Sequence, residues 1–352
     1  MSRDLCCTCW RNNESERLFL RHEGFTNAAR FSTGLKIMTR RGIIISLALI
    51  AILALIAYQL LHSDRPPFTS AIIKELIGQQ DRSVSWYNRK SFRKLRGVAL
   101  VVHGLNQKPE KMGSIIAVLN QEGIDVLNLA LSGHGDNYVS QGRKDHDEQR
   151  LASFRMVSYE LWSAEVYRAY RQIRQRGEQK KVPVFFIGYS LGGVLGGDLL
   201  VSHPDVSFDR MVLFAPALNV TSKSIFLKML APFPDLVIDS LSPKSYRSND
   251  GTPMAAYQAL FKAIEHFEGN LQARLNVSTV IFIDKKDESI SYERLKEMIE
   301  RQKLDQWSIH EVQKDEGIEA GISHHLIIDD ESTGKRMWER MREIMRKHLT
   351  AP

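Results

Sequence analysis

The chain has 352 residues, of which 43% are hydrophobic and 25% charged, a composition typical of a globular protein with a sizeable core. The formal net charge is +7, but residues 1–41 carry eight Lys and Arg against four Asp and Glu, whereas residues 62–352 carry 40 against 37. The main part of the chain therefore lacks the basic surplus of a nucleic-acid-binding protein, and no nucleic acid is expected as a partner.

The basic tail, residues 1–41, contains all three cysteines of the chain. Their spacing matches no familiar zinc site, so no metal is expected. The rest of the chain has no cysteine that could form a disulfide. We expect this tail to be a disordered cytoplasmic segment. Met38, followed by two arginines and an apolar run, fits a natural translation start, which makes residues 1–37 an upstream extension.

Residues 42–61 form an uncharged apolar run, GIIISLALIAILALIAYQLL. At about 1.5 Å per residue, its length matches the roughly 30 Å hydrocarbon core of a bilayer. Arg40 and Arg41 precede the run, so the positive-inside bias places the main domain on the extracytoplasmic (periplasmic) side. No small-x-small cleavage site follows. We expect an uncleaved, single-pass transmembrane signal anchor, with a cleaved signal peptide as the alternative.

After a linker and lead-in at residues 62–90, short apolar runs alternate with helical patterns over residues 91–350. The apolar runs predict buried strands at residues 98–102, 126–130, 182–187, 210–214, 277–283 and, more weakly, 307–312. Apolar residues at helical spacing predict helices at residues 109–120, 147–176, 191–202, 292–302 and 334–349. This alternation is typical of an α/β domain with a mostly parallel sheet and helices on both faces.

The segment at residues 219–276 is far longer than one crossover helix between two strands requires. It contains helical patterns at residues 224–230 and 253–267 and a turn-rich stretch at 242–251, which predict an inserted helical cap. Its apolar residues are expected either to shape an acyl pocket or to bury the cap against the domain; they are Ile225, Phe226, Leu230, Phe233, Leu236 and Val237.

The sequence GYSLG at residues 188–192 fits G-x-S-x-G and lies between the apolar run VPVFFI and a helical segment. In that context the serine, Ser190, occupies a sharp strand-to-helix turn and is a predicted nucleophile. Attack on a carbonyl creates an oxyanion, which needs two preorganised N–H donors. The backbone of Leu191 is one expected donor, and that of Leu105, in the HGLN sequence after an earlier strand, is the other.

A serine nucleophile of this kind is followed in the chain by an acid and then a histidine. The strand at residues 277–283 ends in DKKDE, so Asp287 is the predicted acid, with Asp284 as the alternative. The last loop before the terminal helix contains two adjacent histidines. His325 is the predicted base, with His324 as the alternative.

Two further histidines come before the serine. His134 lies in GHGD at residues 133–136, and its place in the chain argues against the role of base, so we interpret it as a structural loop residue. The imidazole of His103 is interpreted in the same way, as a side chain that hydrogen-bonds its loop.

Together these motifs resemble the α/β-hydrolase superfamily and, within it, the group of monoacylglycerol lipases, lysophospholipases and serine aminopeptidase-like proteins. The resemblance covers roughly residues 90–350 and rests on HGLN at 103–106, GHGD at 133–136, GYSLGG at 188–193, Asp287 and His325. It implies an eight-stranded sheet, a helical cap after the sixth strand, and ester hydrolysis without a cofactor. Related sequences usually carry glycine three residues before the acid, where this chain has Asp284, while their final histidine loop matches SHHLIIDDE and favours His325.

The expected function is hydrolysis of carboxylic esters through an acyl-enzyme on Ser190. The apolar segment at residues 42–61 makes lipid esters, such as monoacylglycerols or lysophospholipids, the favoured substrates. The alternatives are a peptidase or an acyltransferase with the same three side chains and, after these, a non-catalytic binding module.

Overall fold

The computed structural model describes scattered helical residues between 42 and 57 and, continuously, residues 82–140, 145–220, 225–318 and 322–351. By its internal contacts the chain divides into two units, Met1–Leu53 and Ala54–Pro352. Among the residues that are described, no helix is long and apolar enough to cross a bilayer. The basic tail and half of the apolar run at 42–61 lie outside the described residues, so the anchor stays a prediction.

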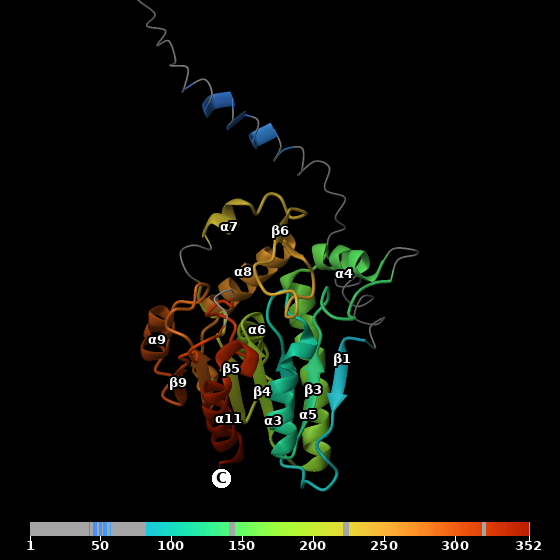
Figure 1. Ribbon diagram of the computed structural model, residues 1–352, viewed down its shortest axis with the longest axis vertical. Coiled ribbons are helices and arrows are strands. Elements are labelled where there is room, and N and C mark those ends of the chain that lie inside the picture. The colour runs from blue at the N-terminus through green and yellow to red at the C-terminus, as the bar shows by residue number, and fades with distance from the viewer. Residues whose placement is uncertain are drawn as a thin grey trace, which may run out of the picture. The chain divides into compact units, whose positions relative to one another are not determined.

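The second unit contains a seven-stranded sheet in the order β1-β3-β2-β4-β5-β8-β9 (Figure 1). Only β1 runs antiparallel to its neighbour, and the other neighbouring strands pair in parallel. The resemblance implied a main sheet of eight strands, and the main sheet formed by the described residues has seven. The strands are Val84–Tyr87 (β1), Gly97–Val102 (β2), Ile124–Leu129 (β3), Val184–Tyr189 (β4), Arg210–Phe214 (β5), Thr279–Ile283 (β8) and Trp307–Glu311 (β9).

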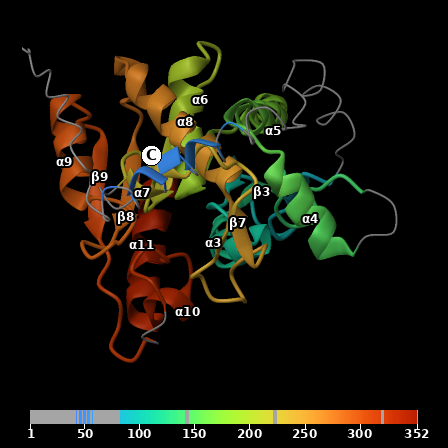
Figure 2. The same ribbon diagram turned by 90° about the horizontal axis from the view of Figure 1, so that it is seen from above.

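The central strands are buried on both faces, because helices cover the sheet from two sides. Figure 2 shows α3 (Gly113–Gln121) and α11 (Lys335–Thr350) on one side of the strands, and α5 (Tyr159–Lys180) and α6 (Leu191–Ser202) on the other. The buried side chains accordingly form two clusters, one on each face. This double burial explains why the strands show uninterrupted apolar runs in the sequence instead of an alternating pattern.

The single helix predicted at residues 147–176 is wrong, because the structure has two helices there. The first, α4 (His146–Arg155), ends at Met156, and α5 begins after Ser158. The Ser158 side chain accepts the N–H of Leu161, which caps the new helix at its N-terminus. The helix predicted at residues 191–202 has the observed bounds, and the other predicted helices are found with shifted ends, among them α9 (Tyr292–Arg301). Two further short elements are η1 (Pro109–Met112) and α10 (Asp330–Thr333).

The segment between β5 and β8 holds the elements expected of an insertion, above the sheet in Figure 1. Its longest helix packs against α6, and two of its strands pair antiparallel with each other. The segment therefore rests on the helix that begins at Ser190. Its elements are α7 (Ile225–Met229), β6 (Val237–Asp239), β7 (Gly251–Pro253), α8 (Met254–Gly269) and η3 (Ala273–Leu275).

Candidate active site

Ser190 joins β4 to α6 at a strained turn. Its φ of 50° and ψ of −110° lie in a region that residues other than glycine rarely occupy. The turn is held from β5, because the Ser190 N–H donates to Phe214 O (2.9 Å) and its carbonyl accepts the N–H of Ala217 (3.0 Å). A Cβ at Gly192 would lie 2.2 Å from Val102 O, so only glycine allows this close approach. The serine itself is 7% exposed.

His325 lies between Ser190 and Asp287. Its Nε2 is 2.8 Å from Ser190 Oγ, and its Nδ1 is 2.8 Å from Asp287 Oδ2. The other carboxylate oxygen accepts the N–H groups of Ser289 (2.8 Å) and Ile290 (2.9 Å), and the Asp287 side chain is 0% exposed. A carboxylate fixed in this way holds the proton on Nδ1 and leaves Nε2 free to accept the serine proton.

The loop that carries His325 is anchored by two charged side chains that the sequence analysis did not single out. Glu288 accepts the backbone N–H groups of His324 (3.1 Å) and His325 (3.2 Å) with its two carboxylate oxygens. Lys314 donates from Nζ to the carbonyl oxygens on either side of the two histidines, at 2.7 and 3.0 Å. Burial lowers the pKa of the Lys314 amine. These bonds fix the position of the histidine loop relative to Ser190.

His324 pairs with Asp284 in the same manner as His325 pairs with Asp287. The His324 Nδ1 lies 2.7 Å from Asp284 Oδ2, and Asp284 Oδ1 accepts the N–H of Lys286 (2.8 Å). The His324 side chain is 37% exposed, compared with 16% for that of His325. The structure thus brings Asp287 and His325 to the serine, and gives the alternative acid and the alternative base to each other.

The HGLN sequence forms a turn after β2 that orients the backbone of Leu105. The carbonyl of Gly104 accepts the N–H of Gln107 (3.2 Å) and lies 2.8 Å from His103 Nδ1. The Leu131 N–H donates to His103 Nε2 (3.0 Å), so the ring proton sits on Nδ1 and points at that carbonyl. In a trans peptide the C=O and the next N–H point in opposite directions, so the Leu105 N–H is turned away from these partners.

The N–H groups of Leu105 and Leu191 are both available at this site. Within the described part of the chain, neither donates to a protein acceptor. Leu191 is the first residue of α6, where backbone N–H groups have no partner within the helix. The two turns are joined by a bond from the Gly192 N–H to His103 O (3.1 Å). The pair can therefore serve as donors to one oxygen atom.

Two buried, neutral histidines support the HGLN turn. His134 Nε2 accepts the N–H of Asn106 (2.9 Å), and the rings of His134 and His103 are 4.5 Å apart. Burial lowers the pKa of His103 to about 4 and lowers the pKa of His134 well below its usual value. Each ring can therefore accept a backbone N–H at neutral pH. The positions of both histidines agree with the structural roles expected from the sequence.

A buried carboxyl group, Glu165, lies beneath the GHGD loop. It accepts the N–H (3.0 Å) and the hydroxyl (2.6 Å) of Ser132 and the side-chain N–H of Asn137 (3.1 Å). Burial raises the pKa of Glu165 to about 7. The sequence analysis missed Glu165. A signal existed, since this charged residue interrupts an apolar helix face between Trp162 and Val166.

The sequence model of the family described as serine aminopeptidase, S33, matches residues 93–346. The chain belongs to this S33 family. The resemblance stated from its motifs is thereby confirmed, and the parallel sheet with helices on both faces is the α/β-hydrolase fold. No curated protein matches the chain.

Solved structures similar to this S33 family member include three whose names describe lipid-cleaving enzymes. A monoglyceride lipase from Saccharomyces cerevisiae, in complex with a substrate analogue, is 12% identical, with a TM-score of 0.60 over 76% of this chain and 90% of its own. A structure reported for the metagenome-derived lipolytic enzymes LipS and LipT is 19% identical, with a TM-score of 0.56 over 76% and 98%. A monoacylglycerol lipase from Paleococcus ferrophilus is 20% identical, with a TM-score of 0.53 over 75% and 98%. At these identities the likeness shows the fold.

The apolar residues of this S33 family member that were expected either to shape an acyl pocket or to bury the cap lie in the insertion. The side chains of Ile225 and Phe226 are outside the described part of the structure. Leu230, Phe233 and Val237 are half-buried, and Leu236 is exposed. The described side chains are therefore not packed into the core.

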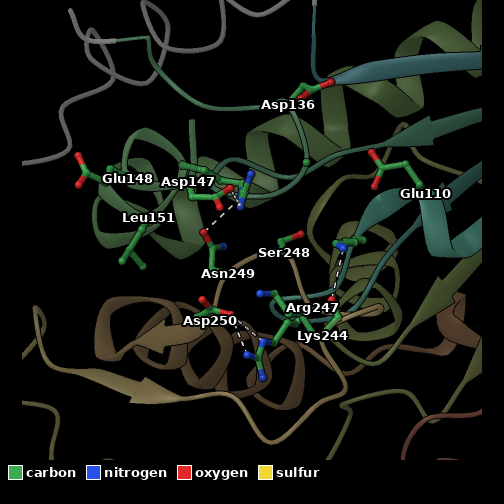
Figure 3. Close-up of a pocket in the computed structure, with 13 residues that line it drawn as sticks. Glu110, Asp136, Asp147, Glu148, Leu151, Lys244, Arg247, Ser248, Asn249 and Asp250 are labelled. Atoms are coloured by element: carbon green, nitrogen blue, oxygen red, sulfur yellow. Dashed lines mark hydrogen bonds and ion pairs between the residues drawn. The ribbon is translucent and has the colours of Figure 1, made fainter. Parts of the chain in front are cut away.

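A cavity of about 470 Å³ lies beside the HGLN turn, between α4 and residues 244–250 of the insertion (Figure 3). Charges of both signs line it, including Lys244 and Arg247 on one side and Glu110 and Asp136 on the other. Ser190 and His325 are not part of its lining. Among the described residues, no group of three or more His, Cys, Asp or Glu side chains could hold a metal ion.

Proposed function

We propose that this chain is a serine hydrolase that cleaves carboxylic esters through an acyl-enzyme on Ser190. The observation that carries the proposal is the continuous path from Ser190 Oγ through His325 to Asp287, with 2.8 Å at each step. The N–H groups of Leu105 and Leu191, which have no acceptor among the described residues, supply the second requirement of acyl transfer.

In the first half of the reaction, Ser190 Oγ attacks the ester carbonyl while its proton passes to His325 Nε2. Asp287 stabilises the resulting imidazolium without taking its proton. The carbonyl oxygen becomes an oxyanion between the N–H groups of Leu105 and Leu191. When the tetrahedral intermediate collapses, the C–O bond to the alcohol breaks, and the alcohol leaves with the proton from His325 Nε2.

In the second half, water takes the place of the alcohol. His325 Nε2 accepts a proton from the water as its oxygen attacks the acyl carbon, and the same two N–H groups hold the second oxyanion. Collapse of this intermediate breaks the bond to Ser190 Oγ, which recovers its proton from His325. The products are a free acid and an alcohol, and the enzyme returns to its starting state.

Lipid monoesters are the proposed substrate class. Two features support this choice: similar structures are named for monoacylglycerol and other lipid substrates, and the sequence carries the apolar run at residues 42–61. We propose that this run anchors the chain in a membrane, with the hydrolase domain on the extracytoplasmic side. Carbonate extraction should leave the full chain in the membrane fraction, and protease added to spheroplasts should digest the domain.

A peptidase is the second candidate, because the matching family is described as serine aminopeptidase. The same nucleophile, base and oxyanion donors cleave esters and amides, so the site itself does not choose between them. An acyltransferase would differ only in the acceptor that replaces water. Rates with monoacylglycerols of graded chain length, aminoacyl amides and added alcohol acceptors separate these activities through their products.

Labelling with a fluorophosphonate probe tests the central proposal. The wild-type chain should react at a single residue, and Ser190→Ala should abolish the labelling and the hydrolysis of a monoacylglycerol. Ser202→Ala on α6 is a matched control, because among the described residues this hydroxyl hydrogen-bonds only the Asp198 and His266 side chains, so its loss should leave both activities intact. Equal labelling of wild type and Ser190→Ala would overturn the proposal.

A further inference from the structure

The insertion between β5 and β8 is bonded directly to the HGLN turn through Asn106 and Asn249. The Asn106 side chain accepts the N–H of Asn249 at Oδ1 (2.9 Å) and donates from Nδ2 to the Asn249 carbonyl (2.9 Å). The amide of Asn106 thus makes both bonds that a paired strand would make with residue 249. Both residues are 4% exposed, so water does not compete for these groups.

Three more bonds join the same loops. The Ser248 N–H donates to Asn106 O (2.9 Å), and the Ser248 hydroxyl donates to Gln107 O (2.9 Å). The Asn249 side chain donates to Gly133 O (2.9 Å), in the loop that also carries His134. The Asn249 side chain also accepts a bond from Arg150 Nε of α4 (3.3 Å). Residues 248 and 249 therefore connect the insertion to both loops that support the oxyanion donor.

Asn106 has an unusual backbone conformation that these bonds help to maintain. Its φ is 53°, in the left-handed region that asparagine tolerates better than most residues. Leu105 stands between this residue and Gly104, whose carbonyl is held by Gln107 and His103. With both neighbours fixed, the peptide that carries the Leu105 N–H has little freedom to turn.

We propose that Asn106, together with Ser248 and Asn249 of the insertion, is a positioning group for the oxyanion hole. The inference rests on the proposed function and extends it, because it gives the insertion a part in setting the direction of the Leu105 N–H. Hydrogen bonds to an oxyanion stabilise the transition state only when the donors are already aimed at it. Loss of the side-chain bonds of Asn106 should therefore reduce kcat much more than it raises KM.

Asn106→Gly is the decisive variant. Glycine adopts a φ of 53° without steric cost, so the backbone conformation stays accessible while both side-chain bonds are lost. We expect kcat to fall roughly 10- to 100-fold with KM within about threefold, since complete removal of one oxyanion donor costs roughly 10²- to 10³-fold. The affinity for a trifluoromethyl ketone, which forms a tetrahedral adduct with serine, should fall in parallel with kcat. Rates are expressed per chain that the fluorophosphonate probe labels at saturation, which removes misfolded protein from the comparison.

Two further variants sharpen the test. Asn249→Ala loses the side-chain bonds to Gly133, Arg150 and Asn106 Oδ1 but keeps the backbone groups that Asn106 uses, so its kcat should lie between those of wild type and Asn106→Gly. Asn270→Ala should match wild type, because within the described structure the Asn270 side chain hydrogen-bonds only His266 O at the end of α8. Full kcat in Asn106→Gly, with the wild type active, would overturn the inference alone. A wild type that reacts with neither probe nor ester would overturn the proposed function and this inference together.

Discussion

Two sets of loops meet at Ser190, and they are held by opposite kinds of interaction. On the base side, residues 284–288 and 323–326, charged carboxylates face two histidines that are partly exposed. On the oxyanion side, residues 103–107 and 131–137, two fully buried imidazoles accept backbone N–H groups. In the proposed mechanism, carboxylates thus lie where a proton is transferred, and neutral rings lie where a backbone only has to be held.

The difference follows from burial. An imidazole without water or a carboxylate nearby loses more by becoming charged than it gains, which is why the pKa of His103 falls to about 4. Its acceptor nitrogen then stays available throughout the pH range in which an ordinary histidine titrates. In the proposed mechanism, the oxyanion side can therefore keep one geometry while His325 gains and loses a proton in each catalytic cycle.

Removing the ring of His325 should have the largest effect. His325→Asn deletes the group that accepts the Ser190 proton, and we expect kcat to fall roughly 10⁶-fold, as for other serine hydrolases that lose the catalytic base. Steady-state hydrolysis of a monoacylglycerol measures the loss, and thermal unfolding checks that the fold is intact. His324 remains in this variant, so a loss of only a few-fold would mean that either histidine can act as the base and that the two pairs are equivalent.

A smaller effect, on stability and not on rate, is expected from the buried carboxyl of the oxyanion side. Burial raises the pKa of Glu165 from 4.5 to about 7, so the folded chain keeps a proton that the unfolded chain releases within this window. The free energy of unfolding should therefore fall as the pH rises from 4.5 to 7, by about 3 kcal/mol from this residue. Urea unfolding of wild type and Glu165→Gln across this range gives the measurement.

The difference between these two proteins isolates Glu165, because other groups titrate equally in both. His103 contributes with the opposite sign: its pKa is lowered in the folded chain, so its contribution to stability grows as the pH rises from about 4 to 6.5. The free energy of unfolding of wild type minus that of Glu165→Gln should therefore be smaller at pH 7 than at pH 4.5. A constant difference between the two would show that the Glu165 carboxyl does not titrate in this range.

His324→Asn should have the smallest effect, with kcat changed by less than about threefold, because partly exposed ion pairs contribute about 0–1 kcal/mol. The His324 backbone N–H still reaches Glu288 in this variant, so the loop keeps its main anchor. Asp284→Gly, which restores the residue common in related sequences, should behave alike in the same ester assay. A loss that approaches that of His325→Asn would give the outer pair a direct part in catalysis.

The sheet could be predicted from the sequence because its central strands are buried on both faces. The strand predicted at residues 210–214 has the observed bounds, and the ends of the other central strands differ from the predicted ends by at most two residues. The first strand, Val84–Tyr87, was missed because it is short, lies at the edge, and alternates between half-buried and exposed residues. The break at residues 156–158 was missed because apolar spacing continues across it and outweighs the capping serine.

The candidate catalytic residues could be predicted from the sequence, but the residues that hold their loops in place could not. Ser190, Asp287 and His325 follow strand ends in motifs that can be recognised locally, and the structure places them in contact. Asn249 cannot be recognised in this way, because its partner Asn106 is 143 residues away and no local pattern links them. Support of this kind depends on tertiary contacts, which a single sequence does not reveal.

The final helix, α11, has a consequence for the order in which the protein is made. Five of its residues are buried against the same face of the sheet that α3 covers. His325 lies ten residues before the helix starts. Synthesis runs from the N-terminus, so a nascent chain acquires Ser190 long before it acquires its base or the cover for that apolar face. If the proposed function holds, we expect the growing polypeptide to be inert toward esters, and its apolar face to be prone to aggregation, until the last turn of α11 leaves the ribosome.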